Sequence, residues 1–305
     1  MRLGTMLSMP GDNATASKLV ERAQRAERAG FDSVWLPQVM GIDALMVLAL
    51  AGRETASIEL GTAVVPTYPR HPSVLASQAL TAQQMSGGRI ALGIGLSHRF
   101  VIEDVLGLDY SRPIPHMREY LTILKGLLSG EQVKFAGELY RVAVQISVAE
   151  AKAPPVLVAA LGPAMLKLCG RLADGTITWM GGIPYLRDVA IPTMTEAALA
   201  AGRPRPRFVA MVPVAVTDDI AAAKVAANRT YAMYGQIPSY RATLDRGGAQ
   251  DPADVAIIGT EEQVETGLRA YAVAGVTDVS AVISPAVGNA EATFELVGAL
   301  AKRGL

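Results

Sequence analysis

The sequence alternates short apolar runs with longer segments of helical periodicity, and this alternation most limits the folds open to the chain. Such alternation is typical of parallel βαβ units. Eight units close most economically into a (β/α)8 TIM barrel, which we expect for residues 1–305 as one α/β domain. A doubly wound sheet with an appended domain is the alternative, because alternation alone does not establish closure. The expected strands span Leu3–Leu7, Ser33–Leu36, Ile58–Val65, Arg89–Ile94, Pro155–Ala160, Gly175–Met180, Arg207–Val216 and Asp278–Ile283. The expected helices span Ala16–Ala29, Ala44–Thr55, Ser73–Met85, Pro115–Leu128, Ala164–Ala173, Tyr185–Ala200, Asp219–Tyr234, Glu262–Ala274 and Ala290–Lys302.

A weak internal repeat supports the barrel. The segments AERAGFDSVWL, GRLADGTITWM and AVAGVTDVSAV share a glycine, a short polar stretch and an apolar run. Glycine just past a helix end tolerates the left-handed conformation that closes the last turn. Each segment is therefore expected to end a helix at its glycine and to continue into a strand.

Two stretches are longer than plain barrel loops. Residues 98–153 contain a helical segment followed by VKFAGELYRV, whose alternation predicts a small strand insertion. Residues 235–256 are polar and contain Gly247 and Gly248, so we expect a mobile lid there. Both follow strand ends, on the face where barrels keep their chemistry.

The balance of charge indicates a small-molecule ligand. Basic and acidic residues number 28 each, so the chain has no overall field to attract nucleic acid or an anionic membrane. The single cysteine, Cys169, excludes an intramolecular disulfide, which fits a cytoplasmic location, and we expect it in the core. No signal peptide or membrane helix is expected, since no apolar stretch is long enough to span a bilayer.

The stretch RIALGIGLSHRF, residues 89–100, carries the strongest local signal. Gly93 and Gly95 end an apolar strand, where glycine lets backbone approach a ring or phosphate, although close packing would explain them equally well. A dinucleotide fingerprint would need a third glycine where His98 stands. His98 is suited to proton transfer near neutral pH, and a structural, hydrogen-bonded imidazole is the alternative.

Two further strand exits are candidates. Pro72 suits the first turn of a helix, so the adjacent His71 is expected to cap or pack against that helix. Gly162 and Pro163 mark another helix start, where unpaired N–H groups of Ala164 and Met165 would suit a phosphate; a plain tight turn is the alternative.

Other chemistries lack their markers. The histidines show no metal-binding spacing, so no metal site is expected, and His116 is expected to be structural. No GxSxG nucleophile elbow occurs. Met40, Trp179 and Met180 lie near strand exits and are candidates for a substrate pocket, although such residues are more often core.

Together, AERAGFDSVWL, GTAVVPTYPRHP, SGGRIALGIGLSH and VAALGPAMLKLCGRLADG resemble the luciferase-like monooxygenase superfamily, in particular its coenzyme F420-dependent branch. The resemblance implies a bulge with a non-prolyl cis peptide behind the deazaflavin ring, at Ala63 and Val64. It implies that the exit at Gly95, Leu96 and Ser97 contacts the cofactor. It also implies that the cofactor phosphate binds at Leu161, Gly162, Pro163, Ala164 and Met165.

The sequence departs from the sugar-phosphate dehydrogenases of this branch. Gln38 and Val39 stand where those enzymes carry an Asp-His pair, and His98 stands where they hold a glutamate. Sugar-phosphate oxidation is therefore not expected. We predict His98 as the proton source, Gln38 as a hydrogen-bonding partner of ring or substrate, and Glu103 as a second catalytic candidate.

The resemblance thus implies an F420-dependent oxidoreductase that reduces an imine, enone or carbonyl. An FMN-dependent monooxygenase is one alternative, although no arginine in LGPAML would clamp the shorter cofactor's phosphate. A non-catalytic barrel that binds a flavin or deazaflavin is the other. Family members commonly form homodimers, and the segment Ala44–Thr55 is apolar on most faces, as an interface requires.

Overall fold

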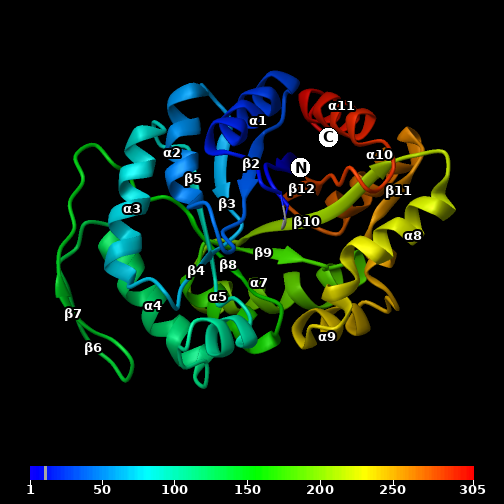
Figure 1. Cartoon of the computed structure of the whole chain (residues 1–305). Coiled ribbons are helices and arrows are strands. Elements are labelled where there is room, and N and C mark those ends of the chain that lie inside the picture. The colour runs from blue at the N-terminus through cyan, green and yellow to red at the C-terminus, as the bar shows by residue number, and fades with distance from the viewer. Residues whose placement is uncertain (10–11) are drawn as a thin grey trace.

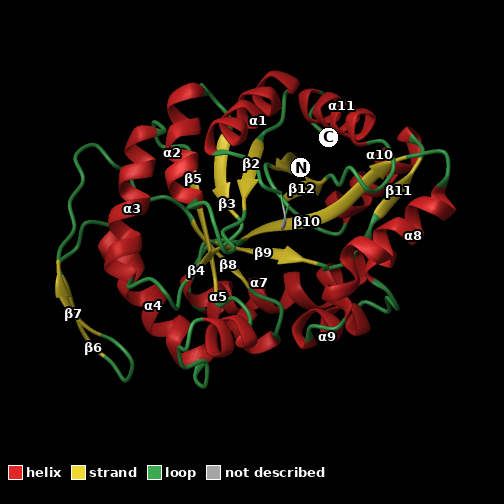
Figure 2. Cartoon of the chain, in the orientation of Figure 1, coloured by secondary structure: helices red, strands yellow, loops and turns green. Residues whose placement is uncertain are grey.

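A computed structural model describes residues 1–9 and 12–305 of the chain. Eight parallel strands form a closed barrel, and helices surround it (Figure 2). The first and last strands of the barrel pair with each other, which closes the sheet. The (β/α)8 barrel is therefore confirmed, and the doubly wound alternative is wrong. In order around the barrel, the strands are β1 (Arg2–Met6), β2 (Ser33–Leu36), β3 (Glu59–Thr62), β5 (Ile90–Gly95), β8 (Val156–Ala159), β9 (Gly175–Trp179), β10 (Arg207–Val216) and β12 (Asp278–Val282).

The expected helices are present, and most begin and end within two residues of the expected positions. The long helix expected at 185–200 is divided into α6, a π-helical segment Leu186–Ala190 and α7, and the helix expected to reach Tyr234 ends at Tyr231. The helices are α1 (Ala16–Ala29), α2 (Ala44–Glu54), α3 (Pro72–Met85), α4 (Pro113–Leu128), α5 (Pro163–Leu172), α6 (Ile183–Tyr185), α7 (Ile191–Ala200), α8 (Ile220–Tyr231), α9 (Pro238–Arg246), α10 (Glu261–Val273) and α11 (Ala290–Lys302).

The third strand is not continuous over Ile58–Val65. It stops at Thr62, and a short strand β4 (Val65–Pro66) resumes the pairing with β5. The peptide bond between Ala63 and Val64 is cis, as the resemblance implied. The interruption therefore lies at the carboxyl end of the barrel.

Both long insertions are structured. The first holds a π-helical segment Val101–Val105, helix α4 and an antiparallel hairpin of β6 (Val133–Ala136) and β7 (Arg141–Val144), which confirms the strand insertion. Figure 1 shows the hairpin at the outer edge of the molecule, beside α3 and α4.

The second insertion contains helix α9, a 3-10 turn Pro252–Val255 and, just after it, strand β11 (Ile257–Gly259), which pairs with β10. Neither α9 nor β11 was predicted. The segment is polar overall, and the few buried side chains of α9, Thr243 and Leu244, give an apolar period too weak to predict a helix. Pro238, the first residue of α9, was a usable signal for the helix start. The mobility of this insertion stays a prediction.

The glycine repeat holds in two of its three copies. Gly30 and Gly275 follow helix ends with left-handed φ angles of 97° and 94°. Gly175 instead begins β9, and α5 ends earlier, at Leu172. A Cβ at Gly175 would lie 2.3 Å from the carbonyl oxygen of Arg207, so this glycine permits close approach of two strands and ends no helix.

Side chains fill the barrel interior, so its two ends are separate surfaces. Trp35 is fully buried in the middle, and a Cβ at Gly61 would lie 2.1 Å from its ring. Below it, Arg207 binds the carboxylates of Glu59 and Asp278 at 2.6 and 2.5 Å. These charged groups close the amino end of the barrel. The predicted site residues follow the ends of the strands and therefore lie at the opposite, carboxyl end, where TIM barrels keep their active sites.

Candidate functional site

Three strand exits approach one another at the carboxyl end of the barrel. A Cβ at Gly95 would lie 2.6 Å from Cγ2 of Val64 and 3.2 Å from Cβ of Ala159. Glycine at the end of β5 thus lets the segment around the cis peptide and the end of β8 come together. The structure brings the predicted residues Val64 and Gly95 into proximity, and close packing accounts for this glycine.

The two residues after Gly95 are oriented by their surroundings. Ser97 has a left-handed φ of 62°, and its carbonyl oxygen accepts a hydrogen bond of 3.5 Å from the hydroxyl of Tyr110. Leu96 and Ser97 are both half-buried. The β5 exit therefore turns sharply at Ser97, so that His98 follows directly at the rim.

The start of α5 is open to solvent. Gly162 is its N-cap residue and makes no side-chain hydrogen bond to the helix, and Pro163 is its first residue. Gly162, Pro163 and Ala164 are exposed, and Met165 is buried. The first N–H groups of this helix thus have no side-chain cap, in contrast to α8, α10 and α11, which Asp219, Thr260 and Asn289 cap. This arrangement fits the phosphate of a cofactor.

The loop before α5 is held from its buried side by a residue that the sequence did not single out. The hydroxyl of Tyr185 donates a hydrogen bond of 2.5 Å to the carbonyl oxygen of Leu161. Tyr185 is fully buried on α6, which follows β9. A lone tyrosine in a helical segment carries no local signal for this contact, because it depends on the neighbouring barrel unit.

His98 is half-buried at the rim and packs against aromatic rings. Its ring centroid lies 5.9 Å from that of Phe100 and 5.6 Å from that of Tyr240 on α9. Burial lowers the pKa of His98 below its ordinary value, because it disfavours the imidazolium. The neutral imidazole therefore predominates at neutral pH.

Tyr240 continues into a set of edge-to-face contacts. Tyr234 lies 5.3 Å from Tyr240 and 5.3 Å from Trp179, measured between ring centroids. We call His98, Tyr240, Tyr234 and Trp179 the aromatic row. It joins the exits of β5 and β9 to the second insertion, and the two tyrosines were not among the predicted site residues.

The three predicted pocket residues have different surroundings. Trp179 is half-buried at the end of β9 and, like Ala63 and Val64, packs against the buried cluster that includes Trp35 and Ile177. Met180 is buried beneath the second insertion, whereas Met40 is 60% exposed on the loop after β2. Of the three, only Trp179 thus belongs to the aromatic row and also packs against the cluster that the cis-peptide segment covers.

The other two catalytic candidates are engaged with their own neighbours. The Gln38 side-chain oxygen accepts a hydrogen bond of 3.2 Å from the Ala44 N–H at the start of α2. Glu103 forms an ion pair of 2.7 Å with Arg99. Both side chains therefore have local structural partners.

The remaining histidines are structural, as predicted. Nδ1 of His71 accepts a hydrogen bond from the Ser73 N–H and caps α3. His116 is buried between Thr67, which lies 2.9 Å from its Nε2, and the ring of Tyr68. Burial lowers the pKa of His116 to about 4, so it is neutral.

Cys169 is buried in the core, as expected. Residues 1–9 and 12–305 contain no group of three or more histidine, cysteine or acidic side chains placed to bind a metal. Within the same residues, no helix combines the length and the apolar character that crossing a membrane requires.

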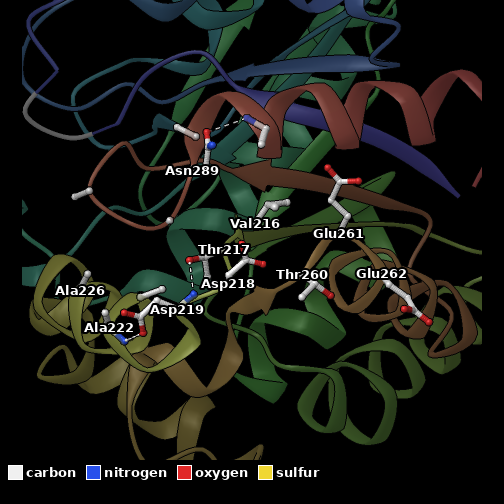
Figure 3. A pocket seen from close by; sticks show the side chains of 15 residues that line it. Val216, Thr217, Asp218, Asp219, Ala222, Ala226, Thr260, Glu261, Glu262 and Asn289 are labelled. Atoms are coloured by element: carbon white, nitrogen blue, oxygen red, sulfur yellow. Dashed lines mark hydrogen bonds between the residues drawn. The ribbon is translucent and has the colours of Figure 1, made fainter.

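A broad open pocket of about 1350 Å³ lies apart from these residues, where β10 and β11 end and α8, α10 and α11 begin (Figure 3). None of the predicted site residues lines it. Its side chains include Asp218, Asp219, Glu261 and Glu262, and the helices that start there are already capped. We therefore place the candidate site at the aromatic row and the α5 start, which hold His98, Trp179 and the predicted phosphate-binding residues.

The family model described as luciferase-like monooxygenase matches residues 1–304. The chain belongs to this family. Among its luciferase-like relatives, the 5,10-methylenetetrahydromethanopterin reductase of Methanolobus tindarius is 31% identical over 246 residues, covering 79% of this chain and 74% of the relative. The F420-dependent glucose-6-phosphate dehydrogenase of Nakamurella multipartita is 30% identical over 265 residues, covering 82% and 76%.

Solved structures show the same fold. An F420-dependent secondary alcohol dehydrogenase in complex with an F420-acetone adduct superimposes with a TM-score of 0.80, at 19% identity over 99% of both chains. The oxygenating constituent of 3,6-diketocamphane monooxygenase of Pseudomonas putida, in complex with FMN, gives 0.77 at 18% identity, covering 100% of this chain and 98% of that one. At these identities the luciferase-like barrel is shared, and the cofactor is a separate question.

Proposed function

We propose that this luciferase-like protein is a coenzyme F420-dependent oxidoreductase that acts on a small organic substrate. The observation that carries the proposal is the convergence of the cis-peptide segment, the β5 exit and the uncapped start of α5 at one end of the barrel. The two relatives named for deazaflavin and methanopterin chemistry support it.

The residues present fit such a cofactor. Ala63, Val64 and Gly95 would back the ring, Leu96 and Ser97 would contact its edge, and residues 161–165 would hold the phosphate. When bound, reduced F420 gives a hydride to the carbon of a C=O, C=N or C=C bond, while a proton goes to the heteroatom or the α carbon.

His98 would supply that proton. Because burial lowers the pKa of His98, its acid form predominates only at pH values below the ordinary pKa of histidine. We expect the reductive rate to fall as pH rises through this lowered pKa. In the reverse direction the neutral imidazole accepts the proton, so the oxidative rate rises through the same pKa to a plateau.

Two further proposals concern the oligomeric state of the protein and its location. A homodimer through α2 is supported by exposed apolar side chains on this helix and the preceding loop, which include Val39, Met40, Met46 and Leu50. We also propose a cytoplasmic location, on the single unpaired cysteine.

The deciding experiment is a pair of fluorescence titrations of the purified protein, with F420 and with FMN. Trp179 is half-buried at the carboxyl end and Trp35 is fully buried inside the barrel, so we expect Trp179 to report binding. F420 should quench the wild-type emission at lower concentration than FMN does, and Trp179→Phe should lose most of the response.

Preference for FMN, together with NADH-dependent oxygen consumption, would instead favour a monooxygenase, for which the FMN-bound structural neighbour provides the fold precedent. Tight F420 binding without hydride exchange across imines, enones and carbonyls would favour a carrier or sensor. Gln38 and Val39, which replace the Asp-His pair, motivate that last candidate.

A further inference from the structure

Tyr234 and Tyr240 have no role in the proposed function so far, yet they connect the proposed proton source, His98, to Trp179. They lie between His98 after β5 and Trp179 at the end of β9, with successive ring centroids 5.6, 5.3 and 5.3 Å apart. The interplanar angles of 65°, 87° and 79° are those of edge-to-face contacts. All four rings are half-buried, so each is partly covered by protein and partly accessible.

The aromatic row is electrically neutral. Burial raises the pKa of Tyr234 and of Tyr240 above the ordinary phenol value, so both hydroxyls stay protonated. Arg99, next to His98, is paired with Glu103, and Arg241, next to Tyr240, is paired with Asp245 at 2.7 Å. The cations adjacent in sequence to the row are thus already neutralised by protein carboxylates.

Trp179 adds a polar requirement. Its indole Nε1 is buried and makes no hydrogen bond of normal geometry in the described part of the chain, although it lies near enough to the Tyr234 side chain to act to lower the pKa of Tyr234 against burial. The indole N–H can only donate, and a buried donor without an acceptor is costly. Trp179 and Val64 pack against the same buried cluster, so an acceptor bound beside Trp179 would lie at the same end of the barrel as the proposed cofactor ring.

From these observations we infer that the aromatic row is the substrate-binding surface, and that it selects a neutral molecule with a flat unsaturated or aromatic ring. The molecule carries a carbonyl or imine acceptor for the indole N–H of Trp179. This inference rests on the proposed function, since it places the substrate beside the deazaflavin. Ring stacking on Tyr234 and Tyr240 provides affinity for the flat group, and the pairing of Arg99 and Arg241 with protein carboxylates disfavours phosphates and carboxylates as substrates.

The test measures equilibrium binding of three probes to the protein loaded with oxidised F420, so that no turnover occurs. Benzylideneacetone is neutral and has a ring; ethylideneacetone lacks the ring; para-carboxybenzylideneacetone adds a negative charge. We expect benzylideneacetone to bind about tenfold more tightly than either of the others.

Two substitutions at one position separate the ring from its hydroxyl. Tyr240→Leu should weaken benzylideneacetone about fivefold to tenfold and leave ethylideneacetone unchanged, while Tyr240→Phe should keep both affinities within about twofold. Trp179→Phe keeps an aromatic ring and removes the N–H, so both neutral enones should lose about fivefold to tenfold.

Equal binding of the three probes, or equal effects of Tyr240→Leu and Tyr240→Phe, would overturn the inference. Tighter binding of the carboxylate would overturn the neutrality that it assigns. The F420 titration of the wild type is read separately: if F420 binds and the probes do not discriminate, only the inference fails. If F420 does not bind, the proposed function fails, and the same probes on the unloaded protein still decide whether the aromatic row selects neutral rings.

Discussion

At the amino end of the barrel, the guanidinium of Arg207 binds Glu59 and Asp278, and Arg2 donates to the same Glu59 at 3.1 Å. At the carboxyl end, the indole N–H of Trp179 lies near the Tyr234 side chain but makes no hydrogen bond of normal geometry among residues 1–9 and 12–305, and His98 is held by ring contacts. The charged groups of the first end satisfy one another, whereas Trp179 and His98 at the second leave hydrogen-bonding capacity for a ligand. We therefore expect substitutions at the amino end to affect stability and those at the carboxyl end to affect activity.

The largest expected effect is on turnover. His98→Ala removes the proposed proton source and should lower kcat by roughly 10²–10⁴-fold in assays with F420, with little change in cofactor affinity or in the unfolding midpoint. His71→Ala is the matched control, because this exposed histidine caps α3 and is not part of the candidate site: about 1 kcal/mol of stability should be lost and kcat kept. Unchanged turnover in His98→Ala would remove this residue from the mechanism.

At the opposite end, Arg207→Met leaves the carboxylates of Glu59 and Asp278 without their main partner. Asp278 is 2% exposed, so its charge is poorly solvated. We expect the free energy of unfolding, measured in urea, to fall by about 3–5 kcal/mol. Arg187→Met, which breaks an exposed pair with Asp188, should leave the free energy of unfolding nearly unchanged, because water screens an exposed ion pair. A similar, small loss in both variants would contradict a stabilising role for the buried ion pairs.

The smallest effect concerns two carboxylates that bind backbone N–H groups. Although burial acts to raise the pKa of Glu119, hydrogen bonds from the N–H groups of Leu139, Glu138 and Tyr140 lower it overall. Its folded pKa is thus below its unfolded value, so this stability is present at neutral pH and is lost as pH falls through the folded pKa.

Glu119→Gln should accordingly cost about 1–2 kcal/mol at pH 7 and reduce the loss of stability between neutral and acidic pH. Glu27, whose pKa is lowered in the same way against its burial by N–H groups of Ser57, Ile58 and Ala56, is more exposed. We expect Glu27→Gln to have a weaker effect in the same urea titrations at several pH values. An unchanged pH profile in both variants would show that these carboxylates do not contribute to acid sensitivity.

The regular part of the fold was accessible from the sequence, because period and capping are local. The helices Ala16–Ala29 and Ala290–Lys302 begin and end where expected, and Pro72 and Pro163 mark helix starts as proline should. The insertion helix α9 and strand β11 were missed, since α9 buries little apolar surface and β11 has only three residues. Closure of the barrel is consistent with eight units but follows only from the pairing of β1 with β12.

Some features of the candidate site were likewise predictable from the sequence, and others depend on the tertiary structure. The sequence alone determined that glycines end the fourth barrel strand, that His98 follows them, and that a proline begins α5, because each depends on residues adjacent in the chain. Only the tertiary structure decided that Tyr240 lies against His98, that Tyr185 holds the carbonyl of Leu161, and that Glu103 is paired with Arg99. The physical reason is that closing the barrel brings strand exits from distant parts of the chain to one end. Two of these three contacts join different barrel units, and the third depends on how the chain turns after β5.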